Sequence, residues 1–174
     1  VFMTSRDGIK WDRRFMAPFI PPGPDPDNWT DRNMTVARGV VPTGPAEISL
    51  YYKEHNRRPS GRFRRGSLRT DGFVSAHATF GGGELVTKPL TFAGSELVLN
   101  YATSVAGGLR VAVQDAEGRP IPGYTLDDSE VIWGDEIERV ARWRGGSGLG
   151  QLAGQTVRLH FAMTEADLYS LRFR

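Results

Sequence analysis

Two clusters of aromatic and polar residues in the N-terminal half have the composition of a sugar-binding site. Trp29 stands at the end of a proline-rich stretch and is followed by Asp31 and Arg32. An indole ring packs against the C–H face of a sugar, while carboxylate and guanidinium groups pair with its hydroxyls. Trp29 and Arg32 are therefore candidate substrate-binding residues. The alternative is that Trp29 fills a hydrophobic gap while Asp31 pairs with Arg32.

The second cluster consists of Tyr52, Glu54 and His55. Glu54 is a candidate general acid, His55 a candidate proton carrier or hydroxyl ligand, and Tyr52 an aromatic contact. Hydrolysis of a glycosidic bond needs two carboxyl groups roughly 5–10 Å apart, so Asp31 and Glu54 are the candidate catalytic pair. A strand end followed by a polar turn is the alternative interpretation of this cluster.

A short arginine-rich segment follows, with a phenylalanine among the basic residues. Guanidinium groups bind carboxylate, sulfate or phosphate through parallel hydrogen bonds, which suits an acidic polysaccharide or a nucleic acid. The alternative is a solvated strand face that protects a sheet edge. Because the segment is too local for a general nucleic-acid binder, the expected partner is a poly- or oligosaccharide, acidic or neutral, and not nucleic acid. The segment contains Arg57, Arg58, Arg62, Phe63, Arg64, Arg65 and Arg69.

Acidic residues gather around Trp133 in the second half, at Asp127, Asp128, Asp135 and Glu136. Clustered carboxylates hold Ca²⁺ in many proteins, so a structural calcium ion is one interpretation. Ion pairs with neighbouring arginines explain the acids equally well, and the spacing of a calcium-binding loop is missing. No Gly-x-Ser-x-Gly elbow occurs, so the sequence does not favour a serine esterase. The histidines share no metal-ligand spacing and cysteine is absent. We therefore predict no cofactor and no metal ligand.

The elements that must position these residues are predicted to be strands. The chain has 174 residues, and its 21 glycines and 11 prolines are interleaved with β-branched and aromatic residues. That pattern is typical of short strands joined by turns, and no amphipathic run suits the helices of a parallel α/β fold. We expect an all-β protein in which residues 80–174 form an antiparallel jelly-roll β-sandwich. Residues 1–79 form a separate β-rich segment, because net charge changes sign at the glycine run Phe80–Gly83.

Membrane insertion is not predicted, because no apolar run reaches the length needed to span a bilayer. The first residues also lack the apolar stretch of a signal peptide. The chain begins at Val1 rather than Met, which indicates a removed leader or a piece of a longer protein.

Three stretches of the chain resemble parts of one known family. Residues 5–11, Ser-Arg-Asp-Gly-Ile-Lys-Trp, resemble the Asp-box-like hairpin of β-propeller glycosidases. Residues 28–33 and 47–52 resemble the last blades of bacterial five-bladed propeller proteins, which are similar to glycoside hydrolase families 32 and 43. Residues 152–161 and 166–173 resemble the final hairpin of the β-sandwich appended to such propellers.

The resemblance implies the C-terminal portion of a glycoside hydrolase, with terminal propeller blade strands followed by a β-sandwich accessory domain. It adds Trp11 to the sugar-facing residues and implies an extracellular or periplasmic location. The isolated chain is expected to be inactive, because the early blades supply half of the catalytic pair. Strand edges left by missing blades need partners, so we expect a homo-oligomer. A non-catalytic carbohydrate-binding module and a purely structural β-sandwich are the alternatives.

Overall fold

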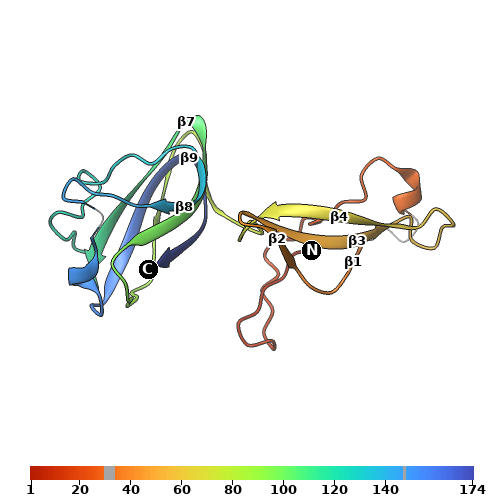
Figure 1. Cartoon of the computed structure of the whole chain (residues 1–174), viewed down its shortest axis with the longest axis horizontal. Coiled ribbons are helices and arrows are strands. Elements are labelled where there is room, and N and C mark those ends of the chain that lie inside the picture. The colour runs from red at the N-terminus through yellow and green to blue at the C-terminus, as the bar shows by residue number, and fades with distance from the viewer. Residues whose placement is uncertain (30–33, 147) are drawn as a thin grey trace. The chain divides into compact units, whose positions relative to one another are not determined.

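The computed structural model describes residues 1–29, 34–146 and 148–174, and the regular elements in these residues are strands and two short 3₁₀ helices (Figure 1). The strands form two antiparallel sheets. The prediction of an all-β protein is therefore confirmed. The chain divides into two compact units, Val1–Leu68 and Arg69–Arg174, each of which contains one of the sheets.

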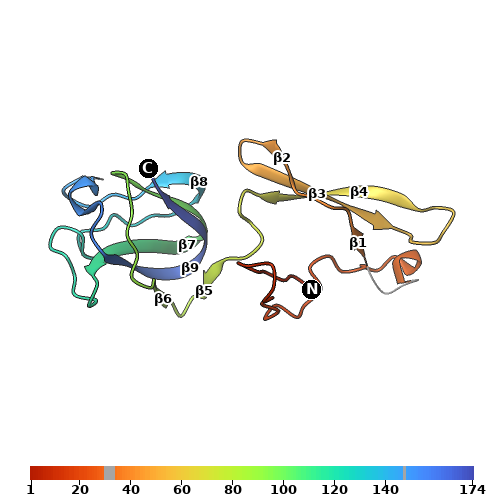
Figure 2. The same ribbon diagram turned by 90° about the horizontal axis from the view of Figure 1, so that it is seen from below.

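In the first unit a central strand pairs with all the others. Strand β3 (Glu47–Glu54) pairs with β1 (Thr35–Val36), β2 (Val41–Gly44) and β4 (Arg62–Arg69), and the 3₁₀ helix η1 (Pro26–Trp29) precedes them (Figure 2). Strand β3 contains β-branched and aromatic residues, which favour the strand conformation. Gly66 of β4 lies beside Leu50 and Tyr52 of β3, at ordinary van der Waals distances.

The first unit has a thin core. Among its described residues, Leu50 is the one buried hydrophobic side chain, at 5% exposure. Large apolar side chains remain on its surface instead, and this combination is unusual for a domain that folds without a covering partner. The exposed ones include Val1, Met3, Ile9, Trp11, Phe15, Met16, Trp29, Val36, Val40, Val41, Tyr51 and Phe63.

The second unit is dominated by two long strands. Strands β7 (Leu97–Asp115) and β9 (Val157–Phe173) pair along almost their whole length, and their register shifts between Thr103 and Gly108. At this shift the backbone of β7 approaches that of β9 so closely that a side chain on Gly107 would collide with the carbonyl oxygen of Glu165. The pair bends at this point. The remaining elements are β5 (Ala76–Ala78), β6 (Gly83–Val86), β8 (Asp135–Val140) and the 3₁₀ helix η2 (Gly150–Leu152).

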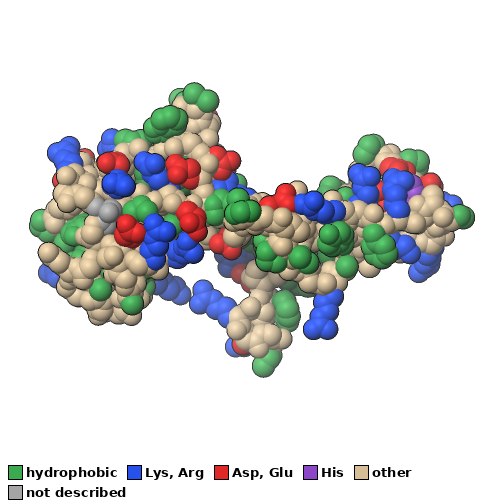
Figure 3. Space-filling view, viewed as in Figure 1, with side chains coloured by type: hydrophobic (Ala, Val, Ile, Leu, Met, Phe, Trp, Pro, Cys, Tyr) green, Lys and Arg blue, Asp and Glu red, His purple; other side chains and the backbone are tan. Residues whose placement is uncertain are grey.

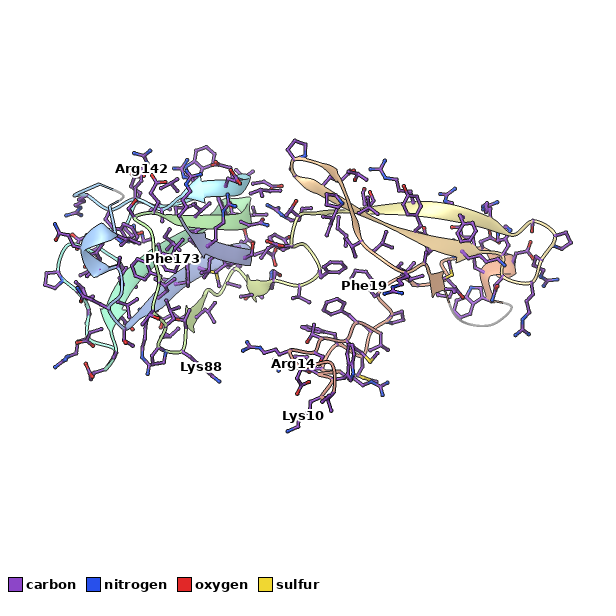
Figure 4. All side chains as sticks on the ribbon, turned by 60° about the horizontal axis from the view of Figure 1, so that its bottom comes forward. Lys10, Arg14, Phe19, Lys88, Arg142 and Phe173 are labelled. Carbon is purple, nitrogen blue, oxygen red and sulfur yellow. The ribbon has the colours of Figure 1, made fainter. Side chains whose placement is uncertain are left out.

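The bend folds the sheet over a single core, so that its two halves face each other as the layers of a β-sandwich do. Alternate residues of β7 supply both sides: Leu97, Leu99 and Tyr101 come from the first half, and Leu109, Val111 and Val113 from the second. Phe92 stacks on Phe173, labelled in Figure 4, with ring centroids 4.1 Å apart. The described strands of this unit form one five-stranded sheet, and the jelly-roll connectivity stays a prediction.

The boundary between the units lies at Leu68 and Arg69, earlier in the chain than the expected division at 79/80. The physical reason is strand pairing. Strand β5 pairs with β9, from Ala76 opposite Leu168 to Ala78 opposite Ala166, which fixes this segment in the second unit. In the described residues no helix has the length and apolarity needed to cross a membrane.

Candidate functional site

A hairpin at the N-terminus presents Trp11. Thr4 and Asp12 exchange both backbone hydrogen bonds, and the Oδ1 atom of Asp7 accepts the N–H groups of Ile9 and Lys10 at 2.9 and 2.8 Å. These backbone hydrogen bonds, chiefly that from Lys10, lower the pKa of the Asp7 carboxyl. The Asp7 side chain therefore closes the turn, as its type and spacing predict, and Trp11 follows on the outgoing arm.

A proline-rich loop presents Trp29. Its prolines restrict the backbone, and two side chains fold it on itself. The Nε1 atom of Trp29 donates to the carbonyl of Gly23 at 2.9 Å, and the amide of Asn28 donates to the carbonyl of Pro22 at 3.0 Å. The indole is therefore held by its polar edge, while the side chain stays 53% exposed.

Trp11 and Trp29 line one pocket of about 640 Å³ in the first unit. Trp11 is 55% exposed, so both indoles offer surface to solvent. The ring centroids of Phe2 and Phe19 lie 5.6 Å apart. Figure 4 labels Phe19, which lies between the sheet and the hairpin that Lys10 and Arg14 mark. The wall is almost wholly apolar. Its other lining residues are Val1, Met3, Met16, Pro18, Ile20, Pro22, Met34 and Val36.

His55 ties the proline-rich loop to the turn between β3 and β4. Its side chain is 7% exposed, and its Nε2 atom lies 2.8 Å from Oδ2 of Asp25. Its Nδ1 atom lies 2.9 Å from Oγ of Ser60, and its backbone N–H donates to Oδ1 of Asn28. The His55 backbone is left-handed, with φ of 53°, which turns the chain sharply after β3.

The same cluster has the donors of a small cation site. Among the described residues, Asp25, Asp27 and His55 bring their ligand atoms within 4.8 Å of one another. One imidazole and two carboxylates suit a divalent ion. Hydrogen bonding to His55 lowers the pKa of Asp25, and Arg58 lies 3.6 Å from Asp27. Both carboxylates of the cluster therefore already have partners among the side chains of the protein.

Glu54 is engaged by the arginines of β4. Its carboxylate lies 2.9 Å from Nε of Arg62 and 3.8 Å from Nε of Arg64. Arg65 pairs in the same way with Glu47. The predicted arginine-rich segment is thus partly neutralised by glutamates of β3, and Figure 3 shows basic and acidic side chains beside a histidine at one end of the first unit.

Arg69, the last arginine of that segment, belongs to the second unit. Its Nε donates to Asn100 at 3.0 Å, its Nη2 donates to the carbonyl of Tyr101 at 3.0 Å, and its Nη1 approaches Asp135 to 2.5 Å. This guanidinium therefore serves packing within the sandwich and offers few donors to a ligand.

The structure brings some of the predicted site residues together and separates others. Trp11 and Trp29 share the pocket, and His55 holds the loop that carries Trp29. Tyr52 packs beside Gly66 and does not line the pocket. Asp31 and Arg32 lie outside the described residues. Asp25 and Ser60 were not predicted from the sequence, and their only signal is their position in the proline-rich loop and in the turn after β3.

The acidic residues of the second half are used by protein partners. Asp128 accepts hydrogen bonds from Thr125, Asp135 pairs with Arg69, and Glu136 lies 3.2 Å from the hydroxyl of Tyr101. Burial, then the charge of Glu136, raise the pKa of Tyr101 to about 12. Of the two tryptophans in this half, Trp143 is buried, at 2% exposure, whereas Trp133 is exposed, at 71%.

Comparison with family models, with curated proteins and with solved structures gives no match for this chain.

Proposed function

We propose that the first unit binds a poly- or oligosaccharide in the pocket lined by Trp11 and Trp29. The observation that carries the proposal is that two half-exposed indoles, supplied by separate loops, line one pocket of about 640 Å³. Sugar rings bind proteins by stacking their C–H faces on aromatic rings. Two exposed indole rings in one pocket can each stack on a sugar ring, which suits an oligosaccharide better than a monosaccharide.

Preorganisation of both platforms supports the proposal. The Asp7 turn holds the arm that carries Trp11, and the Gly23 carbonyl holds the indole of Trp29. Side chains that are already ordered lose less conformational entropy on binding, so more of the stacking energy appears as affinity. Polar groups flank both indoles in the sequence, at Lys10 and Asp12 beside Trp11 and at Asp27 and Asn28 before Trp29.

Binding is better supported than cleavage. Glu54, the candidate general acid, is already ion-paired with Arg62 and Arg64 and does not line the pocket of Trp11 and Trp29. The resemblance to the C-terminal portion of a propeller glycoside hydrolase stays part of the proposal, with Glu54 and Asp31 as the parent's candidate catalytic pair. Under that proposal the chain contributes sugar contacts and an accessory sandwich to the reaction, and a purely structural role is the alternative.

Affinity electrophoresis through gels that contain soluble neutral or acidic polysaccharides tests the binding proposal. We expect retardation by at least one glycan, and loss of that retardation in Trp29→Ala and in Trp11→Ala. Trp133→Ala is the matched control, because Trp133 is an exposed tryptophan of the second unit. Retardation that survives both pocket substitutions, or that is absent with every glycan, contradicts the proposal.

A parallel assay of reducing ends separates binding from hydrolysis. We expect no release of reducing ends by the wild-type chain. Release that disappears in Glu54→Gln would instead make this chain an active hydrolase.

A further inference from the structure

We propose that Ser60, His55 and Asp25 form a nucleophile, base and orienting carboxylate that hydrolyse short carboxylic esters. This activity is separate from carbohydrate binding at the aromatic pocket, since none of the three residues lines that pocket. Catalytic serines are recognised by the roles of these three groups, whatever the order of the residues in the chain. Here Nδ1 of His55 faces the serine and Nε2 faces the carboxylate, the reverse of the usual assignment of the two ring nitrogens.

The distances of the three groups meet the geometric requirement for such a relay. Oγ of Ser60 lies 2.9 Å from Nδ1 of His55, and Nε2 of His55 lies 2.8 Å from Oδ2 of Asp25. A nucleophile and its base must lie within hydrogen-bond reach, with the base oriented by a third group. Both ring nitrogens of His55 therefore have the partners that this chemistry needs.

The hydrogen bonds of His55 define which groups donate and which accept. An ionised carboxylate can only accept, so Nε2 of His55 donates to Oδ2 of Asp25 in this arrangement. In the proposed relay Nδ1 of His55 accepts the Ser60 hydroxyl. The second carboxylate oxygen, Oδ1 of Asp25, accepts the backbone N–H of Asp27 at 3.0 Å, which fixes the orientation of the carboxylate.

The surroundings of Ser60 define the substrate class. Ser60 is exposed while the His55 side chain is almost fully buried, so the nucleophile is accessible and its base is shielded. The exposed neighbours, Arg58 in the turn and Arg62 at the start of β4, are polar and form no apolar wall for a long acyl chain.

The reaction balances with water as the only co-reactant. The Ser60 oxygen attacks the ester carbonyl and its proton passes to Nδ1 of His55. Collapse of the tetrahedral intermediate breaks the bond to the alkoxy oxygen, which leaves as the alcohol with that proton. Water, deprotonated by His55, then attacks the acyl-serine, and the acid and the free Ser60 hydroxyl are released.

Hydrolysis of p-nitrophenyl acetate by the whole chain tests the proposal, together with covalent labelling by a fluorophosphonate probe. We expect Ser60→Ala to lower the rate at least about 100-fold, as removal of a serine nucleophile does, and to abolish labelling. Ser67→Ala, an exposed serine on β4, is the matched control and should keep both.

Two outcomes overturn the proposal. One is a hydrolysis rate that is unchanged in Ser60→Ala, which would mean simple imidazole catalysis or no enzyme. The other is probe attachment at a residue other than Ser60 in the digested protein. Because Ser60→Ala retains the His55–Asp25 pair, loss of folding is not expected to obscure the result, and Trp11→Ala should leave the rate unchanged even if carbohydrate binding fails.

Discussion

The Nε2 atom of His55 lies 2.8 Å from Oδ2 of Asp25, a residue that precedes it by 30 positions in the chain. This contact joins the proline-rich loop to the turn between β3 and β4, and the backbone of His55 adds a second tie through Asn28. The loop that carries Trp29 is thereby fixed against the end of the sheet. Side chains that the sequence presents as separate clusters are parts of one local structure.

Acid should loosen this loop. The pKa of Asp25 in the folded chain lies below its ordinary value of 3.8, so the contact contributes stability that is complete above that pH and is lost as the pH falls through the folded pKa. We expect hydrogen exchange of residues 21–29, corrected for the intrinsic pH dependence, to accelerate below about pH 4. Asp25→Asn should exchange fast at all pH values. Equal protection in the variant and the wild type at pH 6 would contradict this role of Asp25.

The two tryptophans of the second unit should differ sharply in their contribution to stability. Trp143 is buried, donates from Nε1 to the carbonyl of Val111 at 2.9 Å and meets the ring of Tyr124 edge-on. Trp143→Phe leaves that carbonyl unpaired and opens a cavity, so we expect a loss of about 2–3 kcal/mol in the free energy of unfolding. Trp133→Phe is the control and should change it by less than about 0.5 kcal/mol. Urea titration measures both, and equal losses would contradict the assigned burial.

Tyr101 should make the second unit sensitive to alkali. Its pKa is raised to about 12 from 10.0, so the neutral phenol is stabilised in the folded state. The corresponding stability is complete below pH 10 and is lost as the pH rises towards 12. Tyr101→Phe removes the hydrogen bond to the carbonyl of Trp133 and should cost about 1–2 kcal/mol at pH 7. The difference between wild type and variant should shrink between pH 10 and 12 in thermal unfolding, and a constant difference would count against the prediction.

The first unit should drive self-association. Its apolar side chains are largely exposed, whereas the second unit has a contiguous core of its own. We therefore expect light scattering to give a homo-oligomer for the whole chain and a monomer for residues 69–174 expressed alone. Cooperative unfolding of that fragment checks that it is folded. A monomeric whole chain at high concentration would remove the argument for unpaired strand edges.

Prediction from the sequence worked best where the pattern was local. The glycines and prolines among β-branched and aromatic residues predicted strands joined by turns, and residues 5–11 resembled a hairpin. Both features depend on backbone geometry within a few residues. The bend between Thr103 and Gly108 escaped the sequence analysis, since it depends on a close approach of β7 to β9. Because of this bend, the long strands β7 and β9 contribute to both layers of the sandwich. The sequence had predicted many short strands instead.

The candidate site shows the same limit. Trp11 and Trp29 were recognised by residue type, but their shared pocket depends on tertiary contacts that spacing does not encode. Glu54 had the chemistry of a general acid, yet Arg62 approaches its carboxylate from the neighbouring strand. Asp25 and Ser60 were missed because each meets His55 only after the loop and the turn have folded.

The most direct test of carbohydrate binding is an oligosaccharide titration of the ¹⁵N-labelled chain, followed through its four indole N–H resonances. The ligand is the soluble fragment of the glycan that retards the chain most in the gels, or a mixed panel of neutral and acidic oligosaccharides. We predict saturable shifts of the Trp11 and Trp29 resonances while those of Trp133 and Trp143 stay in place. Shifts confined to Trp133, or no shift with any member of the panel, would contradict a sugar site in the first unit.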